Sequence, residues 1–366
     1  MLVIHVAYTP LAGAPIRIIN ALNKYTDYKS RLIDLYPNAY GSRTYEEDLI
    51  WDKDREECLQ LISEADILHF HHFMDFESEN NSFGINFKDI ASKKAKFVRQ
   101  FHSNVNFITK GSAELLNVIR CDKYPKLVIP HPAERSFLSA YLVPNIIPIN
   151  DELLMPQQTN NDIPKVFFSV SSPHSIWTER WDTKGLPEVK DKFSKLAKEI
   201  LFEFEIVENK PYDECIRIKQ NSDVVVGDTT SGCYHLTDLE ALAQGKPTFT
   251  YLDSRSQLTL QNLLQCSELP FVNTRLEEID LPFIKILNDK TLRNDLGKFS
   301  RKWIEQYYDD KILIKHYTKA YEKLLNNEKL VRQSFVDTDI NVKKFLYTDL
   351  YDMQWKQRRN LYYNKS

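Results

Sequence analysis

Apolar runs of strand length alternate with amphipathic segments along most of this chain. Strands are expected at 2–7, 31–35, 65–72, 96–103, 127–132 and 140–150, and then at 164–172, 202–208, 224–226 and 247–251. Helices are expected at 16–24, 45–63, 212–220 and 236–243, with a further helical region at 300–326. Regular alternation of strands with helices predicts parallel sheets and an α/β fold.

The length of the chain and one polar stretch together predict two domains. A chain of 366 residues can form two cores at roughly 150 residues per domain. Residues 151–163 are polar and contain Pro156 and two adjacent asparagines, which is typical of a linker. We therefore expect a first domain at 1–150, a second domain at 164–326 and a C-terminal tail at 327–366.

The segment 222–251 has the clearest pattern, that of a strand, a polar loop, a helix and a second strand. Its β-branched run at 224–226 suits a buried parallel strand, and a loop of small residues follows at 228–232. The helix ends sharply at Gly245, shortly before Pro247. Ligands of parallel sheets bind at the loops that follow the strands, so this loop is the first candidate for a binding site.

The helix after this loop carries a carboxylate on its apolar face. Thr237 and Asp238 are capping candidates for its first turn. Glu240 lies within or beside the stripe that should face the sheet, and a buried carboxylate needs a partner. That partner is either a basic side chain elsewhere in the chain or the hydroxyl groups of a ligand. The loop offers unpaired backbone N–H groups and a helix dipole to a phosphate, so a nucleotide is the ligand that fits.

The sequence GCYHLTDLEALAQGKP at 232–247 resembles the donor-site signature of family 4 retaining glycosyltransferases. In that family, the Glu of a run of the form EA-small-A-x-G-K-P holds the ribose hydroxyls of a nucleotide-sugar, and here it would be Glu240. Many members have another Glu eight residues earlier, where this chain has Gly232. A subgroup has Gly-aromatic-Tyr-Gly at this place, which is similar to 232–235 except that His235 replaces the second Gly.

The resemblance implies the GT-B fold, in which two Rossmann-like domains face each other across a cleft. The second domain would bind the nucleotide-sugar and the first the acceptor, and the configuration of the sugar would be retained. Loop 8–15 would border the cleft, with Gly13 and Ala14 close to the substrates. From the residues alone, an ordinary tight turn between a strand and a helix explains this loop equally well.

Two histidines of the first domain are further candidates. The strand at 96–103 resembles the family strand that ends in a histidine reaching the transferred sugar, which here would be His102. His72 ends the strand at 65–72 and would line the cleft. Without the resemblance, His102 fits a neutral, hydrogen-bonded group at the end of a strand equally well.

The donor diphosphate would be bound by a basic loop of the second domain. Family members carry a basic residue there, and Lys184, which is followed by Gly185, matches it, with Arg180 as a second candidate. The resemblance therefore gives a catalytic role to Lys184 and His102. The full set of donor-binding candidates is Arg180, Lys184, Thr229, Thr230, Ser231, Gly232, Tyr234, Leu236, Thr237 and Glu240.

We expect neither a metal ion nor a cofactor. His69, His71 and His72 lie close in sequence, but the two residues after His72 are not the Asp and His of the H-x-H-x-D-H hydrolase pattern, and no nearby Cys or Glu completes a ligand set. Asp337 and Asp339 match the D-x-D metal motif of the other glycosyltransferase fold, but they lie beyond the second domain. The chain has no GxG sequence, which excludes the dinucleotide fingerprint and the Walker A loop.

Composition narrows the class of partner and the compartment. The net charge of −3, the dispersed basic residues and the pI of about 6.3 argue against nucleic-acid binding. Five cysteines without CxxC spacing favour a reducing, cytoplasmic compartment. No basic leader region and no apolar run of roughly 20 residues is present in the sequence. The tail from residue 331, rich in Tyr, Lys and Arg, could tie the domains together or dock at an anionic membrane.

These patterns predict a metal-independent, retaining glycosyltransferase. It would transfer a sugar from a UDP- or GDP-linked donor to a hydroxyl of a glycan, glycolipid or related acceptor, as in bacterial surface polysaccharide synthesis. Gly232 and His235 also fit a subunit that binds sugar nucleotides without turning them over. A sugar-nucleotide 2-epimerase has the same fold, but the several acid/base carboxylates that it needs are not recognisable in the sequence.

Overall fold

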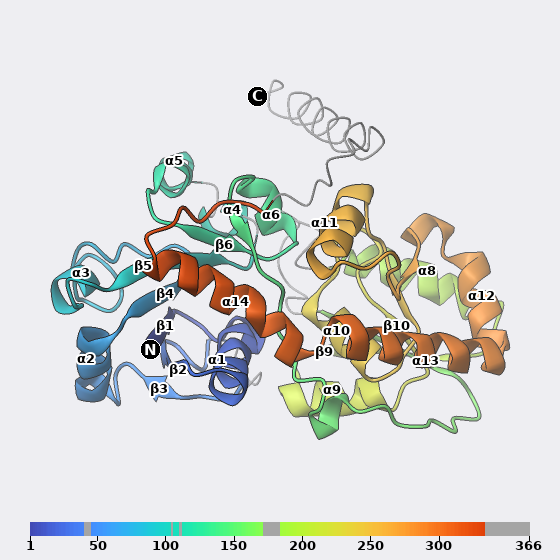
Figure 1. Cartoon of the computed structure of the whole chain (residues 1–366). Coiled ribbons are helices and arrows are strands. Elements are labelled where there is room, and N and C mark those ends of the chain that lie inside the picture. Colours follow the sequence, from blue (N-terminus) through green and yellow to red (C-terminus); the bar gives the residue numbers. More distant parts are fainter. Residues whose placement is uncertain (40–44, 104, 110–111, 171–183, 334–366) are drawn as a thin grey trace.

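The computed structural model of this chain describes all residues except 40–44, 104, 110–111, 171–183 and 334–366. Two parallel β-sheets flanked by helices form two domains that lie side by side (Figure 1). The α/β class predicted from the sequence is therefore confirmed.

The first sheet has seven parallel strands in the order β3-β2-β1-β4-β5-β6-β7. They are β1 (Leu2–Ala7), β2 (Lys29–Asp34), β3 (Leu49–Ile50), β4 (Ile67–His71), β5 (Lys96–Phe101), β6 (Lys126–Val128) and β7 (Tyr141–Leu142). The central strands β1 and β4 are buried along nearly all of their length, as parallel strands covered on both faces should be. Their register places His5 opposite His69.

The second sheet has five parallel strands in the order β12-β11-β10-β8-β9. They are β8 (Lys165–Val170), β9 (Glu203–Glu208), β10 (Val224–Val226), β11 (Thr248–Thr250) and β12 (Val272–Asn273). The direction of winding changes between β1 and β4 in the first sheet and between β8 and β10 in the second. Both sheets are thus doubly wound, and each has a switch point where a ligand can bind.

Helices fill the connections between the strands. In the first domain these are η1 (Leu11–Gly13), α1 (Ala14–Tyr25), α2 (Arg55–Glu64), α3 (Phe87–Ile90), α4 (Val105–Thr109), α5 (Ala113–Cys121) and α6 (Pro132–Ser136). The remainder of the described chain contributes η2 (Glu152–Leu154), α8 (Leu186–Leu196), α9 (Tyr212–Gln220), α10 (Leu236–Ala243), α11 (Ser254–Leu264), η3 (Leu276–Glu278), α12 (Asp280–Asn288), α13 (Lys290–Tyr307) and α14 (Asp310–Leu325). None of the helices in the described ranges is both long and apolar enough to span a membrane.

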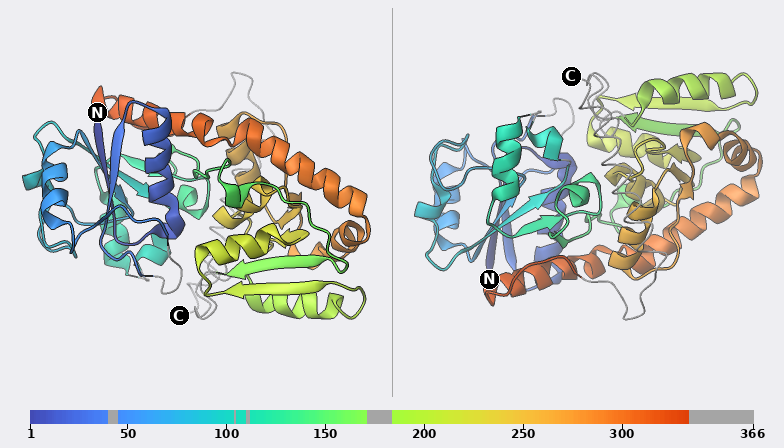
Figure 2. Two further views of the ribbon diagram at one scale, coloured as in Figure 1. Left: turned by 90° about the horizontal axis from the view of Figure 1, so that it is seen from below. Right: turned by 90° about the horizontal axis from the view of Figure 1, so that it is seen from above.

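The helix α14 crosses from the second domain to the first (Figures 1 and 2). α13 packs on α10 of the second domain, whereas α14 packs on α1 of the first. The hydroxyl of Tyr321 lies 2.8 Å from Nδ1 of His69, and the hydroxyl of Tyr317 accepts a hydrogen bond of 3.0 Å from Gln100. The interior of the first domain is therefore completed by a helix that follows the second domain in sequence.

The prediction of a helix at 45–63 is wrong in its first part. Leu49–Ile50 forms the edge strand β3, which pairs with β2, and α2 begins only at Arg55. The side chain of Asp54 accepts a hydrogen bond of 2.8 Å from the backbone N–H of Ile50, which fixes a turn between the strand and the helix. This local hydrogen bond outweighs the helical pattern of the segment.

Two other expected elements differ from the prediction. The strand at 140–150 is paired with the sheet only at Tyr141–Leu142, and the prolines at 144 and 148 that follow have no N–H group to donate to a neighbouring strand. The helical region at 300–326 is two helices, because the chain turns between α13 and α14.

Candidate functional site

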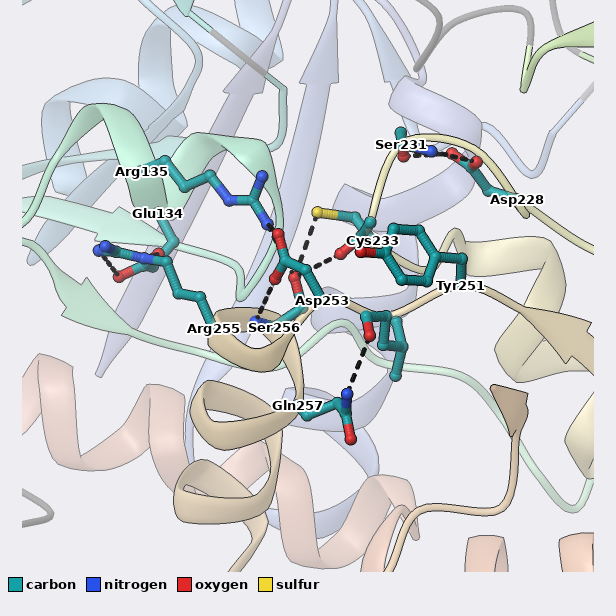
Figure 3. Close-up of polar contacts among 12 residues, drawn as sticks. Glu134, Arg135, Asp228, Ser231, Cys233, Tyr251, Asp253, Arg255, Ser256 and Gln257 are labelled. Carbon is teal, nitrogen blue, oxygen red and sulfur yellow. Dashed lines mark hydrogen bonds and ion pairs between the residues drawn. The ribbon is translucent and has the colours of Figure 1, made fainter. Parts of the chain in front are cut away.

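Loops that follow strands of both sheets meet at the boundary between the domains. The ring of His131, after β6, packs against the ring of Tyr234, after β10, with centroids 4.3 Å apart. Arg135 of α6 contacts Asp253, after β11, at 2.6 Å (Figure 3). In doubly wound sheets, ligands bind at the switch point, outside the carboxyl ends of the strands. The loops that follow these strand ends meet here in both sheets, so the candidate site lies at this boundary.

The loop after β10 is organised by the carboxylate of Asp228, which is fully buried. Its Oδ1 accepts hydrogen bonds from the backbone N–H groups of Thr230 and Ser231, at 2.8 and 2.9 Å. Its Oδ2 accepts from the hydroxyl of Ser231 (Figure 3) and lies 3.0 Å from Nε2 of His235. The expectation that the loop offers unpaired N–H groups is therefore wrong for Thr230 and Ser231.

These contacts keep Asp228 charged. Burial alone would raise the pKa of this carboxyl, but the hydrogen bonds from His235, Ser231 and Thr230 hold the pKa below its ordinary value. A fixed negative charge thus lies inside the loop, and an anionic ligand would have to bind outside it.

The N-terminus of α10 is the other element of this loop that could hold an anion. The helix begins at Leu236, after the N-cap residue His235, so the capping candidates Thr237 and Asp238 lie within its first turn. Asp238 still serves the helix end, because its Oδ2 accepts a hydrogen bond of 2.8 Å from the His235 backbone N–H. Leu236 and Thr237 present first-turn N–H groups, which have no acceptor within the helix.

Lys184 and Gly185 lie against the loop after β10. Both have left-handed backbone, with φ of 48° and 66°. A Cβ atom on Gly185 would lie 2.6 Å from Cγ2 of Thr230, so only glycine lets the two loops approach this closely. The sequence pair Lys-Gly therefore fixes how the basic loop meets the loop after β10.

The ammonium group of Lys184 has no anionic or hydrogen-bonding partner among the described residues, and its Nζ lies 6.0 Å from the centre of the Phe168 ring. Lys184 is 3% exposed and makes no hydrogen bond or ion pair with any residue that the structure describes. Burial lowers its pKa, and the nearby carboxylates of Asp238 and Asp228 oppose this effect. A buried cation without a paired anion is costly, which makes this position one where an anionic ligand would be stabilised.

The structure supplies basic partners for Glu240, the first of the two alternatives for this carboxylate. Nζ of Lys219 lies 2.7 Å from Oε2, and Nη2 of Arg17 lies 2.8 Å from Oε1. The hydroxyl of Tyr212 donates to the same Oε1 at 3.0 Å. Burial would raise the pKa of Glu240, but Lys219 and Arg17 lower it to about 2. A carboxylate has about four lone-pair sites, so a ribose hydroxyl can still bind beside these partners.

Gly232 lies beside the ion pair between Arg135 and Asp253, which Figure 3 shows. Its φ is 84°, and a Cβ atom there would lie 3.1 Å from Oδ2 of Asp253. The hydroxyl of Ser256 donates to the Gly232 carbonyl at 2.7 Å, while Asp253 accepts from the Ser256 N–H and from Arg135. A glutamate at this position would need left-handed backbone and would displace Asp253. The departure from the resembled signature at residue 232 therefore has a local physical reason.

A second buried ion pair joins the domains next to the first (Figure 3). Glu134 of α6 accepts two hydrogen bonds of 3.0 Å from Arg255 of α11. Arg332, in the described beginning of the tail, also contacts Glu134, and its backbone N–H donates to the Ser139 carbonyl at 2.8 Å. Residues 334–366 of the tail and Arg180 lie outside the described residues.

The other donor-binding candidates differ in how they could act. Tyr234 is fully buried and packs between His131 and Phe271, so its side chain belongs to the core. Thr229 is 1% exposed and its carbonyl accepts a hydrogen bond from the Leu276 N–H at 3.1 Å.

Several buried oxygen atoms near this loop lack a hydrogen-bond partner among the described residues. They are Thr229 Oγ1, Thr237 Oγ1, Asp238 Oδ1 and Thr250 Oγ1. Asp238 and Thr250 both lie against Gly227, where a Cβ atom would be 2.4 and 2.7 Å from these oxygens. Unpaired buried polar atoms are rare in folded proteins, and their concentration here points to a ligand or water.

The loop after β1 has an unusual backbone. Leu11, Ala12 and Gly13 are all left-handed, with φ of 48°, 57° and 76°. Such strained backbone is found preferentially at ligand-binding loops, which favours the cleft interpretation over an ordinary tight turn. Ala14 is the first residue of α1, and the same helix carries Arg17 to Glu240.

His72 and His102 lie together at the ends of β4 and β5. His72 has φ of 68°, and burial lowers its pKa to about 4. Its ring is 5.6 Å from that of His102 in an edge-on arrangement. His102 is 9% exposed, and its Nε2 lies 2.8 Å from Nδ1 of His71.

One group of metal-ligating side chains with atoms close together occurs in the described part of the chain. It consists of His5, His69 and His71, whose ligand atoms lie within 4.8 Å of one another, and all three residues are buried. The sequence-based argument against a metal site used only neighbours in sequence and missed His5. Parallel pairing of β1 with β4 brings this residue opposite His69.

Two surface hollows border the ends of β11 and β12. One, of about 250 Å³, is lined by residues including Tyr251, Asp253, Asn273 and Arg275. The other, of about 310 Å³, is lined by residues including Gln257, Phe271 and Phe299. Neither is lined by Lys184, Glu240 or His102.

Sequence reasoning missed three residues of this site. Asp228 follows a strand and precedes Thr and Ser, a pattern typical of a side chain that accepts hydrogen bonds from the next turn, so it could have been found. Arg17 interrupts an apolar helix face, which is a weaker signal. Lys219 gave no signal, because a lysine near the end of a helix is usually exposed.

Solved structures with similar folds include an alpha-glucosyltransferase in complex with UDP-glucose and DNA containing an abasic site. It is 12% identical, with a TM-score of 0.60, over 87% of this chain and 98% of that chain. HepE from Anabaena in complex with UDP is also 12% identical, with a TM-score of 0.54, over 88% and 100% of the two chains. The chain has the GT-B fold.

A third similar structure is sucrose-phosphate synthase from Thermosynechococcus elongatus. It is 14% identical, with a TM-score of 0.51, over 90% of this chain and 100% of that chain. No protein-family model and no curated protein sequence matches the chain. At these identities the likeness establishes the GT-B fold, with its two Rossmann-like domains, and the chemistry must be argued from the site.

Proposed function

We propose that this GT-B protein is a retaining hexosyltransferase or close relative that uses a UDP- or GDP-linked sugar. The observation that carries the proposal is the buried ammonium of Lys184, which has no ion pair or hydrogen bond among the described residues and lies beside the loop after β10 and the N-terminus of α10. A diphosphate is the anion that fits, because it can contact the ammonium and the helix end together. Similar folds bind UDP or UDP-glucose, which supports the same class of donor.

The chemistry follows from where charge develops. As the nucleoside diphosphate leaves, negative charge accumulates on its phosphate oxygens, and Lys184 and the helix dipole stabilise that charge without a metal ion. Glu240, oriented by Lys219 and Arg17, accepts hydrogen bonds from the ribose. The first domain binds the acceptor hydroxyl near Gly13, Ala14, His72 and His102.

The acceptor that we propose is a glycan, a glycolipid or a related surface polysaccharide precursor in the cytoplasm. One group of similar structures is bound to DNA, but this chain has a net charge of −3, which disfavours a polyanion. A lipid-linked acceptor would agree with docking of the basic tail at the inner face of a membrane.

The test is a mass-spectrometric screen of UDP- and GDP-sugars, in EDTA, with slow donor hydrolysis as the first readout. Glycans, glycolipids and duplex DNA then serve as acceptors. Release of the nucleoside diphosphate with transfer of the sugar and retention at C1 is the expected result. Donor binding without turnover would instead indicate a sugar-nucleotide-binding subunit, and a C2-epimerised product would indicate an epimerase.

A further inference from the structure

A buried chain of hydrogen-bonding side chains runs from the interior of the first domain to His102. Nε2 of His102 lies 2.8 Å from Nδ1 of His71, and Nε2 of His71 lies 2.9 Å from Nδ1 of His5. Nε2 of His5 lies 3.4 Å from the hydroxyl of Tyr321, which is 2.8 Å from Nδ1 of His69. All five residues are at most 9% exposed.

The inner end of this hydrogen-bond chain lies at the side-chain oxygen of Gln100, which can only accept a hydrogen bond. The hydroxyl of Tyr317 donates to the backbone carbonyl of Pro144 at 2.9 Å, so its oxygen accepts from the amide of Gln100. Oε1 of Gln100 and Nε2 of His69 are both buried, and neither has a hydrogen-bond partner of good geometry among the described residues. The side chain of Gln100 nevertheless acts on His69 as a hydrogen-bond acceptor, because it raises the pKa that burial lowers. Since Oε1 is the acceptor atom of Gln100 and has no proton, this interaction places the ring proton of His69 on Nε2.

This anchor determines the proton positions along the whole chain. With Nε2 of His69 protonated, Nδ1 must accept from the hydroxyl of Tyr321. The oxygen of Tyr321 then accepts from Nε2–H of His5, and Nδ1 of His5 accepts from Nε2–H of His71. The last link requires His102 to donate from Nε2 to Nδ1 of His71, which leaves Nδ1 of His102 with its lone pair.

We propose that this buried chain fixes His102 as the Nε2–H tautomer, so that its Nδ1 accepts a hydrogen bond from a hydroxyl of the bound sugar or acceptor. Nδ1 of His102 is buried and has no partner among the described residues, as expected for an atom reserved for a ligand. The ligand part of this inference rests on the proposed function, whereas the tautomer does not. His5, His71 and Tyr321 act on the substrate only through His102 and are positioning residues.

Burial keeps the histidine rings neutral, as the hydrogen-bond chain requires. It lowers the pKa of His5, His71 and His102 well below the ordinary value, and the neighbouring histidines lower these values further. A neutral imidazole has one donor and one acceptor nitrogen, so each ring passes the same orientation to the next.

The matched variants are Tyr321→Phe and Tyr28→Phe. Tyr321→Phe deletes one link and keeps the ring. Tyr28→Phe deletes a buried hydroxyl that has no partner among the described residues, on a ring 5.7 Å from Tyr321. Long-range nitrogen–proton NMR correlation on histidine-labelled protein reports the tautomer of each ring without any substrate.

We expect wild type and Tyr28→Phe to show His102 as a single Nε2–H tautomer, and Tyr321→Phe to show a mixture. With an active donor and acceptor pair, Tyr321→Phe should lower kcat several-fold at unchanged donor KM. The proposed hydrogen-bond chain would be refuted, whatever the activity, by a His102 that is protonated on Nδ1 in the wild type. Identical tautomers in both variants would also refute it. Stoichiometric zinc bound by His5, His69 and His71 would also overturn it, because these rings would then be ligands.

Discussion

Nη2 of Arg17 lies 2.8 Å from Oε1 of Glu240, so a helix of the first domain bonds directly to the helix that borders the candidate donor site. The other oxygen of Glu240 is paired with Lys219, which is fully buried. Glu240 therefore has a structural task as well as its proposed contact with ribose. Substitutions that remove its charge must be compared with ones that preserve its shape.

The first prediction separates these two tasks of Glu240. Glu240→Ala leaves Lys219 buried without its carboxylate and should cost about 3–5 kcal/mol of unfolding free energy. Glu240→Gln keeps an acceptor and the side-chain volume, so it should cost less stability and still raise donor KM about 10-fold. Urea unfolding and donor titration measure both effects. Glu305→Gln, at an exposed glutamate paired with the buried Arg301, is the control, and an unchanged donor KM in Glu240→Gln would make Glu240 purely structural.

The second prediction concerns the charge of Lys184. Lys184→Ala should lower kcat by about 100-fold or more, because the ammonium matters most as the diphosphate departs. Lys184→Arg should recover only part of the rate, since a forked guanidinium does not replace a point-like ammonium. Lys246→Ala removes another buried lysine, whose Nζ lies 3.4 Å from the Gln157 carbonyl, and controls for loss of a buried charge.

Activity of the wild-type enzyme should persist in EDTA. Loss of activity in EDTA with rescue by manganese, together with full activity of Lys184→Ala, would refute the proposed leaving-group chemistry.

The third prediction tests the contact between the basic loop and the loop after β10. Gly185→Ala places a methyl group 2.6 Å from Cγ2 of Thr230, whereas Gly84→Ala meets no atom within 4 Å at the same φ of 66°. Both variants should lose about 1–2 kcal/mol of stability through left-handed backbone. Gly185→Ala alone should also weaken donor binding, measured by calorimetry. Equal donor affinity in the two variants would show that the loop contact does not shape the site.

The fourth prediction is a loss of stability in acid. His72 has a pKa of about 4 in the folded chain against 6.5 in the unfolded one, so the unfolded chain binds its proton first. Its contribution to stability is present above pH 6.5 and is lost as the pH falls toward 4, at up to about 1.4 kcal/mol per pH unit. Burial lowers the pKa of five other histidines, so their contributions to stability are also lost in acid. They are His5, His69, His71, His102 and His131.

His72→Asn provides the measurement, because asparagine tolerates the left-handed backbone at this position. Between pH 6.5 and 4, the slope of unfolding free energy against pH should become smaller in the variant. The decrease should correspond to about one proton fewer taken up on unfolding. An unchanged slope would mean that His72 does not titrate on unfolding in this range.

The sequence determined the arrangement of strands and helices better than the contacts of the site. The unit at 222–251 is reproduced by β10, α10 and β11, because β-branched runs, a Gly-Lys-Pro stop and an apolar stripe are local signals. The edge strand β3 was missed, since two residues are too few to show a period.

The contacts of the site join residues that are far apart in sequence, and no local sequence pattern shows which of them come together. His5 meets His69 and His71 only because β1 and β4 are parallel and in one particular register. Arg17 and Lys219 reach Glu240 from α1 and α9, which are far apart in sequence. Local charge patterns therefore indicated that Glu240 needs a partner, but not which residue supplies it.

The crossing of α14 into the first domain has a consequence for how the protein is made. On the ribosome, the strands β1 to β7 emerge long before Tyr317 and Tyr321, which contact Gln100 and His69 in their interior. Domains usually fold as units in the order of their synthesis, but here the earlier unit lacks part of its interior until the later one has been translated. We therefore expect the two halves of the molecule to complete their folding together, with the first half incompletely packed until α14 has been made.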